Sequence, residues 1–581
     1  MLKRNLTVLA TLTVVACMPI NCFAAEYYLE DGNISIHSDG TSQTVTQSEN
    51  TIEDLNPLIK NREPGTATNN TIEISSDQGA VADVTIEDVN IFVPQGEEGS
   101  GIDVKGDSEA LITVKGENFV ENANGESAVH VADGALGITG DGTLNAKTHG
   151  TLNSDETMLL EGAAIGTNSH EDLNGSITIG GNSKINASVG SQDFEHEGAA
   201  IGTGCGGDIT KDAMISVIGQ AVVDAKTDDD GAGIGSGADG DIDGSVIIKD
   251  NAKVKASSNY DGAGIGTGEG GSLGEDGLIC ITGKANVNGI TEDDGAGIGV
   301  GRKGDFYGKI LIDGESHVEA SSDSEGAAIG AGEDTEGYES SQIIIGGKAV
   351  VVAKAKRYST GIGTGDESSF AGDIIIQDEA DVTSIGTGSA AAIGADNVGD
   401  MTGSIQILGK SKVTTGARFG AEIIFDSSTP GIIGTGGYRE TKKDNIKYVI
   451  GSGVTINGIK ADSEENLAKI LDVYTKASST ENVTQEEKPI DLQKFEPKLE
   501  QAKLPSSNIK PAEDPVKPET KPDVKPTISQ VKLLNTTLEQ PAEPTSKTPT
   551  SVMTNGAAWL GLAGLSATLG SILTFKKRNS K

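Results

Sequence analysis

Short apolar stretches alternate with glycine, aspartate and asparagine through the middle of the chain. In the segment that starts at Gly231, apolar stretches occupy 232–234, 245–248 and 253–256 and are bounded by turn-forming residues. Runs of Ile and Val of this length, with alternating polar positions, are typical of β-strands. No helical spacing interrupts them, so the pattern predicts three short strands in each successive unit.

The units are marked by a cassette, Gly-Ala-(Ala/Gly)-Ile-Gly, that recurs at nearly constant spacing. Its isoleucines stand 31 to 36 residues apart, at Ile165, Ile201, Ile234, Ile265, Ile298, Ile329, Ile362 and Ile393. A period of about 32 residues indicates a repeat architecture. Three strands and three turns per period predict an all-β fold, a right-handed single-stranded parallel β-helix whose strands stack into three sheets. We expect ten to twelve coils.

Columns of aliphatic residues predict the core of this fold. The third strands align Val223, Val254, Val287, Val318, Val351, Val382 and Val413, and the second strands align pairs such as Ile279 and Ile281. Residues two apart on a strand point to the same side, and stacked repeats bury such columns continuously. A narrow core of this kind also explains why aromatic residues make up only 3% of the chain while glycine occurs 79 times.

Regions outside the repeats have a different composition. A helix is expected near Ile52–Lys60 and another at 463–476, where Leu467, Ile470, Leu471 and Tyr474 share one face. The predicted organisation is a signal peptide (1–24), an N-terminal cap with the first coils (25–98), β-helix repeats (99–460), a C-terminal capping helix (461–477), a disordered Pro/Lys/Glu-rich linker (478–550) and a sorting signal or membrane anchor (551–581).

The N-terminus has the features of a secretory signal. Lys3 and Arg4 precede an apolar run from Leu6 to Met18, and small residues precede Ala25. The alternative is a lipoprotein signal ending in a lipidated Cys17, and the two interpretations stay open.

The C-terminus predicts an anchor. Residues 557–575 are apolar or small and are followed by a basic tail, and a helix of this length approaches the thickness of a bilayer core. The order of signal, repeats, Pro-rich stretch, apolar run and basic tail resembles Gram-positive cell-wall-anchored surface proteins. Ser551-Val552-Met553-Thr554-Asn555 stands where that family has Leu-Pro-x-Thr-Gly. The resemblance implies an extracellular, cell-surface location and peptidoglycan attachment through Thr554; the residues alone also fit simple membrane anchoring.

Residues 70–460 resemble glycine-rich β-helical surface proteins, some of which are adhesin-like or carbohydrate-binding. The resemblance implies a non-enzymatic adhesin that presents an acidic rod to a glycan or a host surface protein. A polysaccharide lyase or hydrolase and a passive surface coat are the alternatives. A net charge of −41 excludes nucleic acid as a partner. The six histidines show no metal spacing, and Arg302-Lys303 beside Asp305 is the single basic irregularity in the central repeats, so we expect no enzyme.

Acidic residues precede the cassettes and form a ladder on successive coils: Glu161, Glu197, Asp230, Asp261, Asp294 and Glu325. Carboxylates at this spacing repel one another unless cations or water screen them. The ladder is therefore either a hydrated turn or a row of weak Ca²⁺ sites or a dock for a cationic partner.

A more specific calcium motif is Asp239-Gly-Asp241-Ile-Asp243-Gly, followed by Asp250. Alternating carboxylates that end in glycine match the first half of a calcium loop. A strand rather than a helix follows, and the last ligand would be Asp. A Ca²⁺ site and a plain Gly/Asp loop are both open.

The middle residue of the second strand is apolar in a contiguous block and should point away from the core. Ile247, Leu311, Ile344 and Ile375, together with Cys280, would then form an apolar stripe. Contiguous exposed apolar surface usually marks a contact site. The alternative is that a neighbouring loop covers it.

Overall fold

The computed structural model describes residues 25–152, 159–190, 198–387, 390–396, 399, 401–419, 422–424, 432–436, 446–475, 483–484 and 489–506. The signal peptide, Cys17, Glu197, Thr554 and the whole of 551–581 lie outside these residues. None of the helices in the described residues is both long and apolar enough to cross a membrane.

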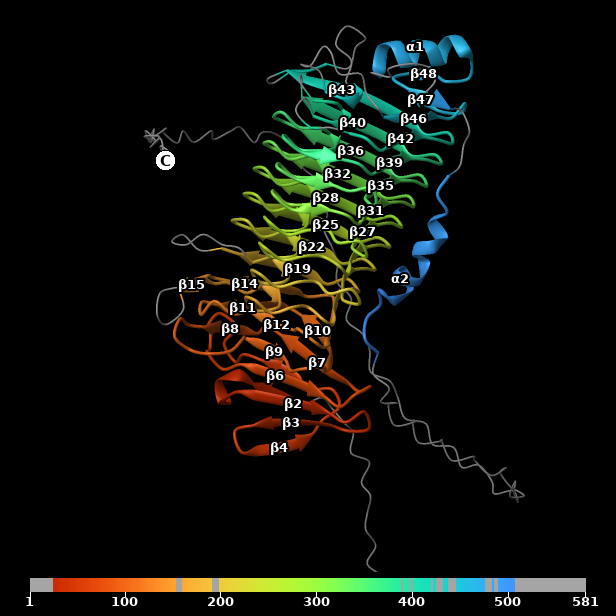
Figure 1. The fold of residues 1–581 in the computed structure, drawn as a ribbon. Helices are drawn as coiled ribbons and strands as arrows, with labels where there is room; N and C mark the ends of the chain where they lie inside the picture. Colours follow the sequence, from red (N-terminus) through yellow and green to blue (C-terminus); the bar gives the residue numbers. More distant parts are fainter. Residues whose placement is uncertain are drawn as a thin grey trace, which may run out of the picture. The chain divides into compact units, whose positions relative to one another are not determined.

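Three long sheets, which we call A, B and C, make up the fold (Figure 1). Each central repeat contributes one strand to each sheet, and neighbouring strands within a sheet come from successive repeats. The fold is therefore all-β with long parallel sheets.

Sheet A has 15 strands, all paired in parallel. In spatial order they are β1 (Glu26–Tyr28), β5 (Leu58–Lys60), β7 (Val81–Glu87), β10 (Glu109–Lys115), β13 (Ala135–Gly140), β18 (Ser176–Ile179), β21 (Met214–Val217), β24 (Ser245–Ile248), β27 (Leu278–Ile281), β31 (Lys309–Ile312), β35 (Gln342–Ile345), β39 (Asp373–Ile376), β42 (Ser404–Ile407), β46 (Lys447–Ile450) and β49 (Val483–Thr484).

Sheet B contains the cassette strands and also has 15 members. They are β4 (Asn50–Glu53), β3 (Gln43–Gln47), β2 (Ile34–Ser38), β6 (Ile72–Ser76), β9 (Ile102–Val104), β12 (Val129–His130), β17 (Ile165–Gly166), β20 (Ile201–Gly202), β23 (Ile234–Gly235), β26 (Ile265–Gly266), β29 (Ile298–Gly299), β33 (Ile329–Gly330), β37 (Ile362–Gly363), β41 (Ile393–Ala395) and β45 (Ile433–Thr435).

Sheet C has 14 strands. They are β8 (Asn90–Val93), β11 (Glu117–Asn122), β14 (Thr143–Thr148), β19 (Lys184–Val189), β22 (Val222–Thr227), β25 (Lys253–Ser258), β28 (Asn286–Thr291), β32 (His317–Ser322), β36 (Val350–Ala355), β40 (Asp381–Thr387), β43 (Lys412–Phe419), β44 (Glu422–Ile424), β47 (Thr455–Ile456) and β48 (Ile459–Lys460).

Smaller elements complete the described chain. They are the pair β15 (Thr151–Leu152) and β16 (Leu159–Leu160), the three short strands β30 (Asp305–Phe306), β34 (Glu336–Gly337) and β38 (Ser369–Phe370), the 3₁₀ helices η1 (Leu29–Asp31) and η3 (Leu492–Phe495), and the helices α1 (Glu464–Tyr474) and α2 (Glu496–Gln501).

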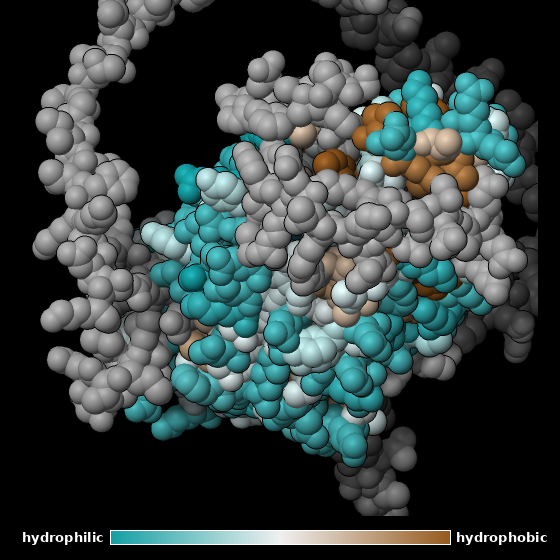
Figure 2. Space-filling view, turned by 45° about the horizontal axis from the view of Figure 1, so that its top comes forward, coloured by the Kyte–Doolittle hydropathy of each residue, from teal (hydrophilic) through white to brown (hydrophobic). Residues whose placement is uncertain are grey.

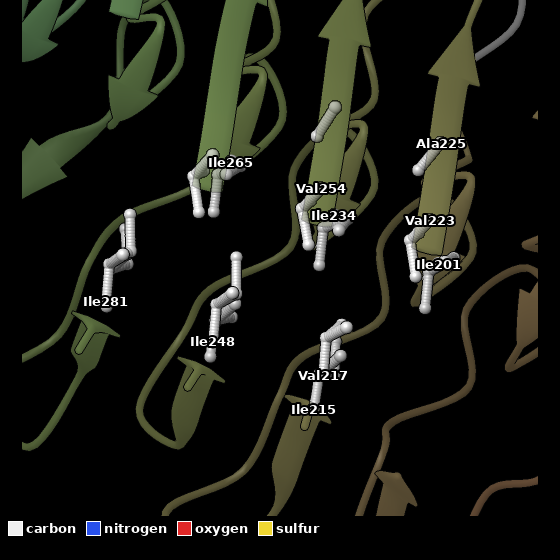
Figure 3. Close-up of a cluster of buried hydrophobic side chains, with 14 of the residues drawn as sticks. Ile201, Ile215, Val217, Val223, Ala225, Ile234, Ile248, Val254, Ile265 and Ile281 are labelled. Atoms are coloured by element: carbon white, nitrogen blue, oxygen red, sulfur yellow. The ribbon is translucent and has the colours of Figure 1, made fainter. Parts of the chain in front are cut away.

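The register of all three sheets places like residues on top of one another. Ile234 pairs with Ile265 in sheet B, and Val254 pairs with Val287 in sheet C. Figure 3 shows these aliphatic columns, with Ile201, Ile234 and Ile265 following one another through the core. The predicted columns are buried, so the inward-facing positions read from the sequence are confirmed.

The three sheets extend beyond the cassette repeats. The N-terminal segment has no cassette, yet it supplies strands to all three sheets. Its Ile52–Lys60 stretch, predicted as helical, contributes to β4 and β5, and Ile52 is 52% exposed. Pairing with neighbouring strands overrides the local helical pattern.

The predicted C-terminal helix is present as α1. The Ser463 hydroxyl caps its N-terminus by accepting a hydrogen bond from the Asn466 N–H. The apolar face predicted for this helix packs against the hydrophobic core through Leu467, Ile470, Leu471 and Tyr474.

The cassette glycines allow the closest approach between repeats. Gly202, Gly235 and Gly266 have φ values of 144° to 145°, a region that L side chains rarely occupy. A Cβ added at Gly235 would lie 1.7 Å from the carbonyl oxygen of Gly266 in the next repeat. Any side chain at this position would therefore separate the repeats.

Part of the region predicted as a disordered linker is ordered. Residues 489–506, which we call the strap, include η3 and α2 and run beside the strands of sheet A (Figure 1). Phe495 and Ala502 of the strap are buried, and Ile490, Leu492 and Leu499 pack against the same cluster. Burial of these apolar residues stabilises the docked strap. The overall Lys- and Glu-rich composition of the segment does not indicate this packing.

Candidate functional site

Two columns of side chains meet beside the cassette strands. Within each cassette the N–H of the alanine donates to the carbonyl four residues later, as from Ala232 to Ser236. This tight loop returns the chain toward the preceding repeat. As a result the N–H of Glu269 donates to the carbonyl of Asp230 at 2.9 Å, and the N–H of Glu333 donates to the carbonyl of Asp294 in the same way.

The outcome is a cluster of carboxylates, which we call the carboxylate row. It contains three overlapping groups whose carboxylate oxygens lie within 4.8 Å of one another: Asp230–Asp261–Glu269, Asp261–Asp293–Asp294 and Asp294–Glu325–Glu333. Asp261 and Asp294 each belong to two groups. The row therefore runs continuously across successive repeats instead of forming separate sites.

Arg302 is the basic residue inside the row. Its Nε donates to Glu333 at 2.7 Å, and its Nη1 lies 3.1 Å from Asp261 and 3.7 Å from Glu269. Lys303 pairs with Glu269 at 2.5 Å from the more exposed edge. The guanidinium is thus occupied by three carboxylates, and it neutralises only part of the charge in the row.

Crowding and burial change the acidity of the row. Burial, followed by repulsion from Asp229 and other neighbouring carboxylates, raises the pKa of Asp230 to about 8. Burial and the charge of Asp294 raise the pKa of Glu333 to about 7, despite Arg302. Burial also raises the pKa of Asp261, against the opposing effect of Arg302. Asp230 and Glu333 are therefore partly protonated near neutral pH, and a bound cation would relieve the repulsion within the row.

The predicted ladder supplies part of this row. Asp230, Asp261, Asp294 and Glu325 lie in it, whereas Glu161 is buried at an earlier repeat and Glu197 lies outside the described residues.

The sequence interpretation missed two members of the row, Glu269 and Glu333. Each stands seven residues after the first glycine of its cassette, so the shared repeat position was the available signal.

The predicted calcium loop is not assembled. Among the described residues, no three of Asp239, Asp241, Asp243 and Asp250 form a group within 4.8 Å. Asp241 accepts the Ser272 N–H at 2.8 Å, while Asp250 lies past β24 and accepts the Gly219 N–H at 3.0 Å. The strand between Asp243 and Asp250 carries the last ligand away, so the spacing of a calcium loop does not produce its geometry here.

The predicted apolar stripe exists, but it is covered. Ile247, Leu311, Ile344 and Ile375 are 0 to 2% exposed, and they pack in one cluster with Phe495 of the strap. Cys280 lies in the same cluster, and burial raises the pKa of its thiol to about 12. The stripe points away from the core, as predicted. Of the two alternatives, an exposed contact face and cover by another segment, the structure shows cover, because the strap packs on the stripe.

Polar contacts hold the strap in place along several repeats. The side-chain amide of Gln377 donates to the Ile490 carbonyl at 3.0 Å and accepts the Ile490 N–H at 2.8 Å. Further along, Lys249 donates to the Leu499 carbonyl at 2.6 Å. At the far end, a Cβ added to Gly137 would lie 2.6 Å from Pro505, so the strap spans sheet A from β39 to β13.

One histidine in the N-terminal repeats, His130, lies between two carboxylates. His130 contacts Asp103 through Nδ1 at 2.9 Å and Glu171 through Nε2 at 2.8 Å. These carboxylates outweigh the effect of burial and raise the pKa of His130 to about 9. The imidazole is therefore a charged link between three repeats, not a poised general base.

The face of the molecule shown in Figure 2 is largely hydrophilic. In Figure 2 teal dominates the described surface, and brown atoms gather in small groups toward the upper right of the view.

Comparison with protein-family models, with curated proteins and with solved structures finds no match to this chain.

Proposed function

We propose that this chain is a non-catalytic binding protein of the bacterial cell surface, and that the carboxylate row binds Ca²⁺ and, through it, a glycan. The observation that carries the proposal is the set of three overlapping carboxylate groups with Arg302 as the basic residue among them. The proposed fold is a right-handed parallel β-helix with three strands per coil, since connections between parallel strands are right-handed in about 98% of cases.

The spacing of the oxygens suits calcium. Oxygen ligands of one Ca²⁺ lie at most about 5 Å apart, because each bond measures about 2.5 Å, and the groups here lie within 4.8 Å. Carboxylate oxygens are the ligands that hard divalent cations prefer. Three carboxylates leave several of the six to eight positions around Ca²⁺ for water or for the hydroxyl groups of a sugar.

Two observations favour binding over catalysis. The guanidinium of Arg302, the predicted basic irregularity, is held by Asp261, Glu269 and Glu333. The row extends over several successive repeats, which suits multiple weak contacts with a repeating polymer. A polysaccharide lyase or hydrolase is the second candidate, and a passive coat the third.

The surface location rests on the ends of the sequence. A leader before Ala25, apolar residues 557–575 and a basic tail support secretion followed by anchoring. We propose attachment through the C-terminal segment, by covalent linkage at Thr554 or by membrane insertion.

The test uses calorimetry on the chain that ends at residue 512, the boundary of the compact unit. Ca²⁺ should bind and release protons at pH 7, because Ca²⁺ displaces protons from carboxyls with raised pKa values. The triple variant Asp230→Asn/Asp261→Asn/Asp294→Asn should lose this binding. Its matched control is Asp239→Asn/Asp243→Asn/Asp250→Asn, which removes the same charge outside the row.

A polysaccharide panel, tested with Ca²⁺ and with chelator, then identifies the ligand. Retention that needs Ca²⁺ and an intact row, without released fragments, supports the proposal. Released oligosaccharides would move the assignment to an enzyme. Equal Ca²⁺ binding by both triple variants would exclude the row as the site.

A further inference from the structure

A pocket lies between the strap and the edge of sheet A. Its volume is about 260 Å³, and residues of both parts line it: Glu275, Asp276, Gly277, Leu278 and Lys309 from the repeats, and Lys494, Phe495 and Lys498 from the strap. Neither part alone encloses this space, so the pocket exists only while the strap is docked.

Three lysines converge on the pocket in a chain whose net charge is −41. Among the described residues, neither Lys309 nor Lys494 forms an ion pair with a carboxylate. Burial, followed by the charge of Lys309, lowers the pKa of Lys494. Burial also lowers the pKa of Lys498; the charge of Asp276 opposes this effect, and the charge of Lys309 adds to it. The ammonium groups therefore repel one another, and the charges of Asp276 and Asp491 offset this repulsion only in part.

The carboxylates at the rim supply only part of the counter-charge that three lysines require. Asp276 is already paired with Lys211 at 2.6 Å, and Glu275 is the other acidic residue in the lining. Lys498 uses its ammonium to donate to Ser245 Oγ at 3.0 Å and to the Asp276 carbonyl at 3.1 Å. Lys309 and Lys494 are left as donors for an incoming anion.

The other walls are apolar. Phe495 is 8% exposed and packs in the stripe cluster with Leu278, and the ammonium of Lys494 lies 4.8 Å from the centre of its ring. The volume falls just below the roughly 300 Å³ at which pockets begin to hold drug-sized ligands. The space suits a ligand the size of one sugar ring, with C–H groups toward Phe495 and a charged group toward the lysines.

We propose that this pocket is a second binding site, which takes the carboxylate or sulfate group of an acidic monosaccharide unit. It uses residues distinct from the carboxylate row, binds the opposite charge and does not rest on the function proposed above. The strap thus has a role beyond covering the apolar stripe, because it supplies two of the three lysines and the aromatic wall.

The experiment is calorimetric titration of the full chain with glucuronate, glucose 6-sulfate and uncharged glucose, in chelator to silence the row. We expect glucuronate, glucose 6-sulfate or both to bind, glucose not to bind, and affinity to fall with added salt. Binding by glucuronate alone identifies a carboxylate ligand, and binding by the sulfate alone identifies a sulfated one. Equal affinity for glucose, or no binding of either anion at millimolar concentration, would overturn the proposal.

Variants separate the site from general charge effects. Lys309→Gln/Lys494→Gln should weaken anion binding at least tenfold, whereas Lys284→Gln/Lys410→Gln, which removes two exposed lysines elsewhere, should not. Glu275→Gln should strengthen binding several-fold because it removes a repelling carboxylate, a gain that strap detachment cannot cause. Equal losses in both lysine pairs, or no gain with Glu275→Gln, would contradict the assignment.

Discussion

Two faces of the same repeats differ in whether another segment of the chain covers them. The outer face of sheet A carries an apolar column, from Ile247 to Ile375, and the strap covers it completely. The carboxylate row beside sheet B stays partly open to solvent, with the side chains of Asp261 and Glu333 each 15% exposed. When one type of residue recurs at the same position of successive repeats, its side chains form an extended surface of one chemical character.

The physical chemistry of the two faces explains the difference. Covering an apolar column removes it from water and contributes about 1.5–3 kcal/mol for each large side chain that becomes fully buried. Covering a column of carboxylates would strip charges of water at a cost of several kcal/mol per ion. The chain can therefore cover the first face with its own segment, while the second is suited to ions or to a ligand that arrives with its own charge.

The largest effect is expected when the strap is deleted, because the apolar face of sheet A then becomes exposed like the carboxylate row. A chain that ends at residue 488 should expose the stripe, bind a hydrophobic dye such as ANS, self-associate and lose several kcal/mol of stability. The chain that ends at 512, which retains the strap, is the control. If the shorter chain stays monomeric and does not increase ANS fluorescence, the strap is not what shields the stripe from solvent.

A single side chain should reproduce much of that effect. Phe495→Ala leaves a cavity against the stripe, and such truncations cost about 3–5 kcal/mol at well-packed sites. We expect the strap to detach while the sheets remain folded, with faster hydrogen exchange confined to 489–506 and its contacts. Phe119→Ala, at a residue 41% exposed, is the matched control and should change little. Uniform loss of protection throughout the sheets would mean that the strap is part of the global core.

The contrast between the faces was only partly predictable from the sequence. Alternation and register follow from local pattern, which is why the core columns and the outward direction of Ile247 and Leu311 were predictable. The cover was not, because Gln377 and Ile490, which hold it, are 113 residues apart and the strap is compositionally a linker. Glu269 and Glu333 were missed because their approach to the acidic ladder depends on how the cassette closes on itself.

On the acidic face, pH should act in the direction opposite to ordinary acid denaturation. Asp230 and Glu333 have folded-state pKa values of about 8 and about 7, above the usual values for carboxyl groups. The native state therefore binds more protons than the unfolded state between about pH 5 and 8, and stability falls as pH rises through this window.

Thermal melts from about pH 5 to 9 in chelator should show a falling Tm, with an effect on the order of 1 kcal/mol per carboxyl after solvent screening. Asp230→Asn/Glu333→Gln should make the fall shallower without abolishing it, because His130, with a folded-state pKa of about 9, also loses its proton in this range. Ca²⁺ should restore the Tm of the unmodified chain at high pH. Asp239→Asn/Asp243→Asn serves as the charge-matched control. A Tm that rises over this range in the unmodified chain would show that the row is not under electrostatic strain.

The smallest effect sharpens the role of Arg302. Arg302→Gln leaves Asp261, Glu269 and Glu333 without their shared cation, so stability in chelator should fall by about 1 kcal/mol, as expected for a partly exposed pair. The same variant should bind Ca²⁺ more tightly, since the lost charge increases the negative potential of the row. Lys303→Gln, which removes a cation from the exposed edge, should give a weaker change of the same sign. Arg302→Gln is thus expected to lower stability and to raise Ca²⁺ affinity. If both stability and Ca²⁺ affinity fall, Arg302 holds the carboxylates in the geometry that binds Ca²⁺ and does not compete with the ion.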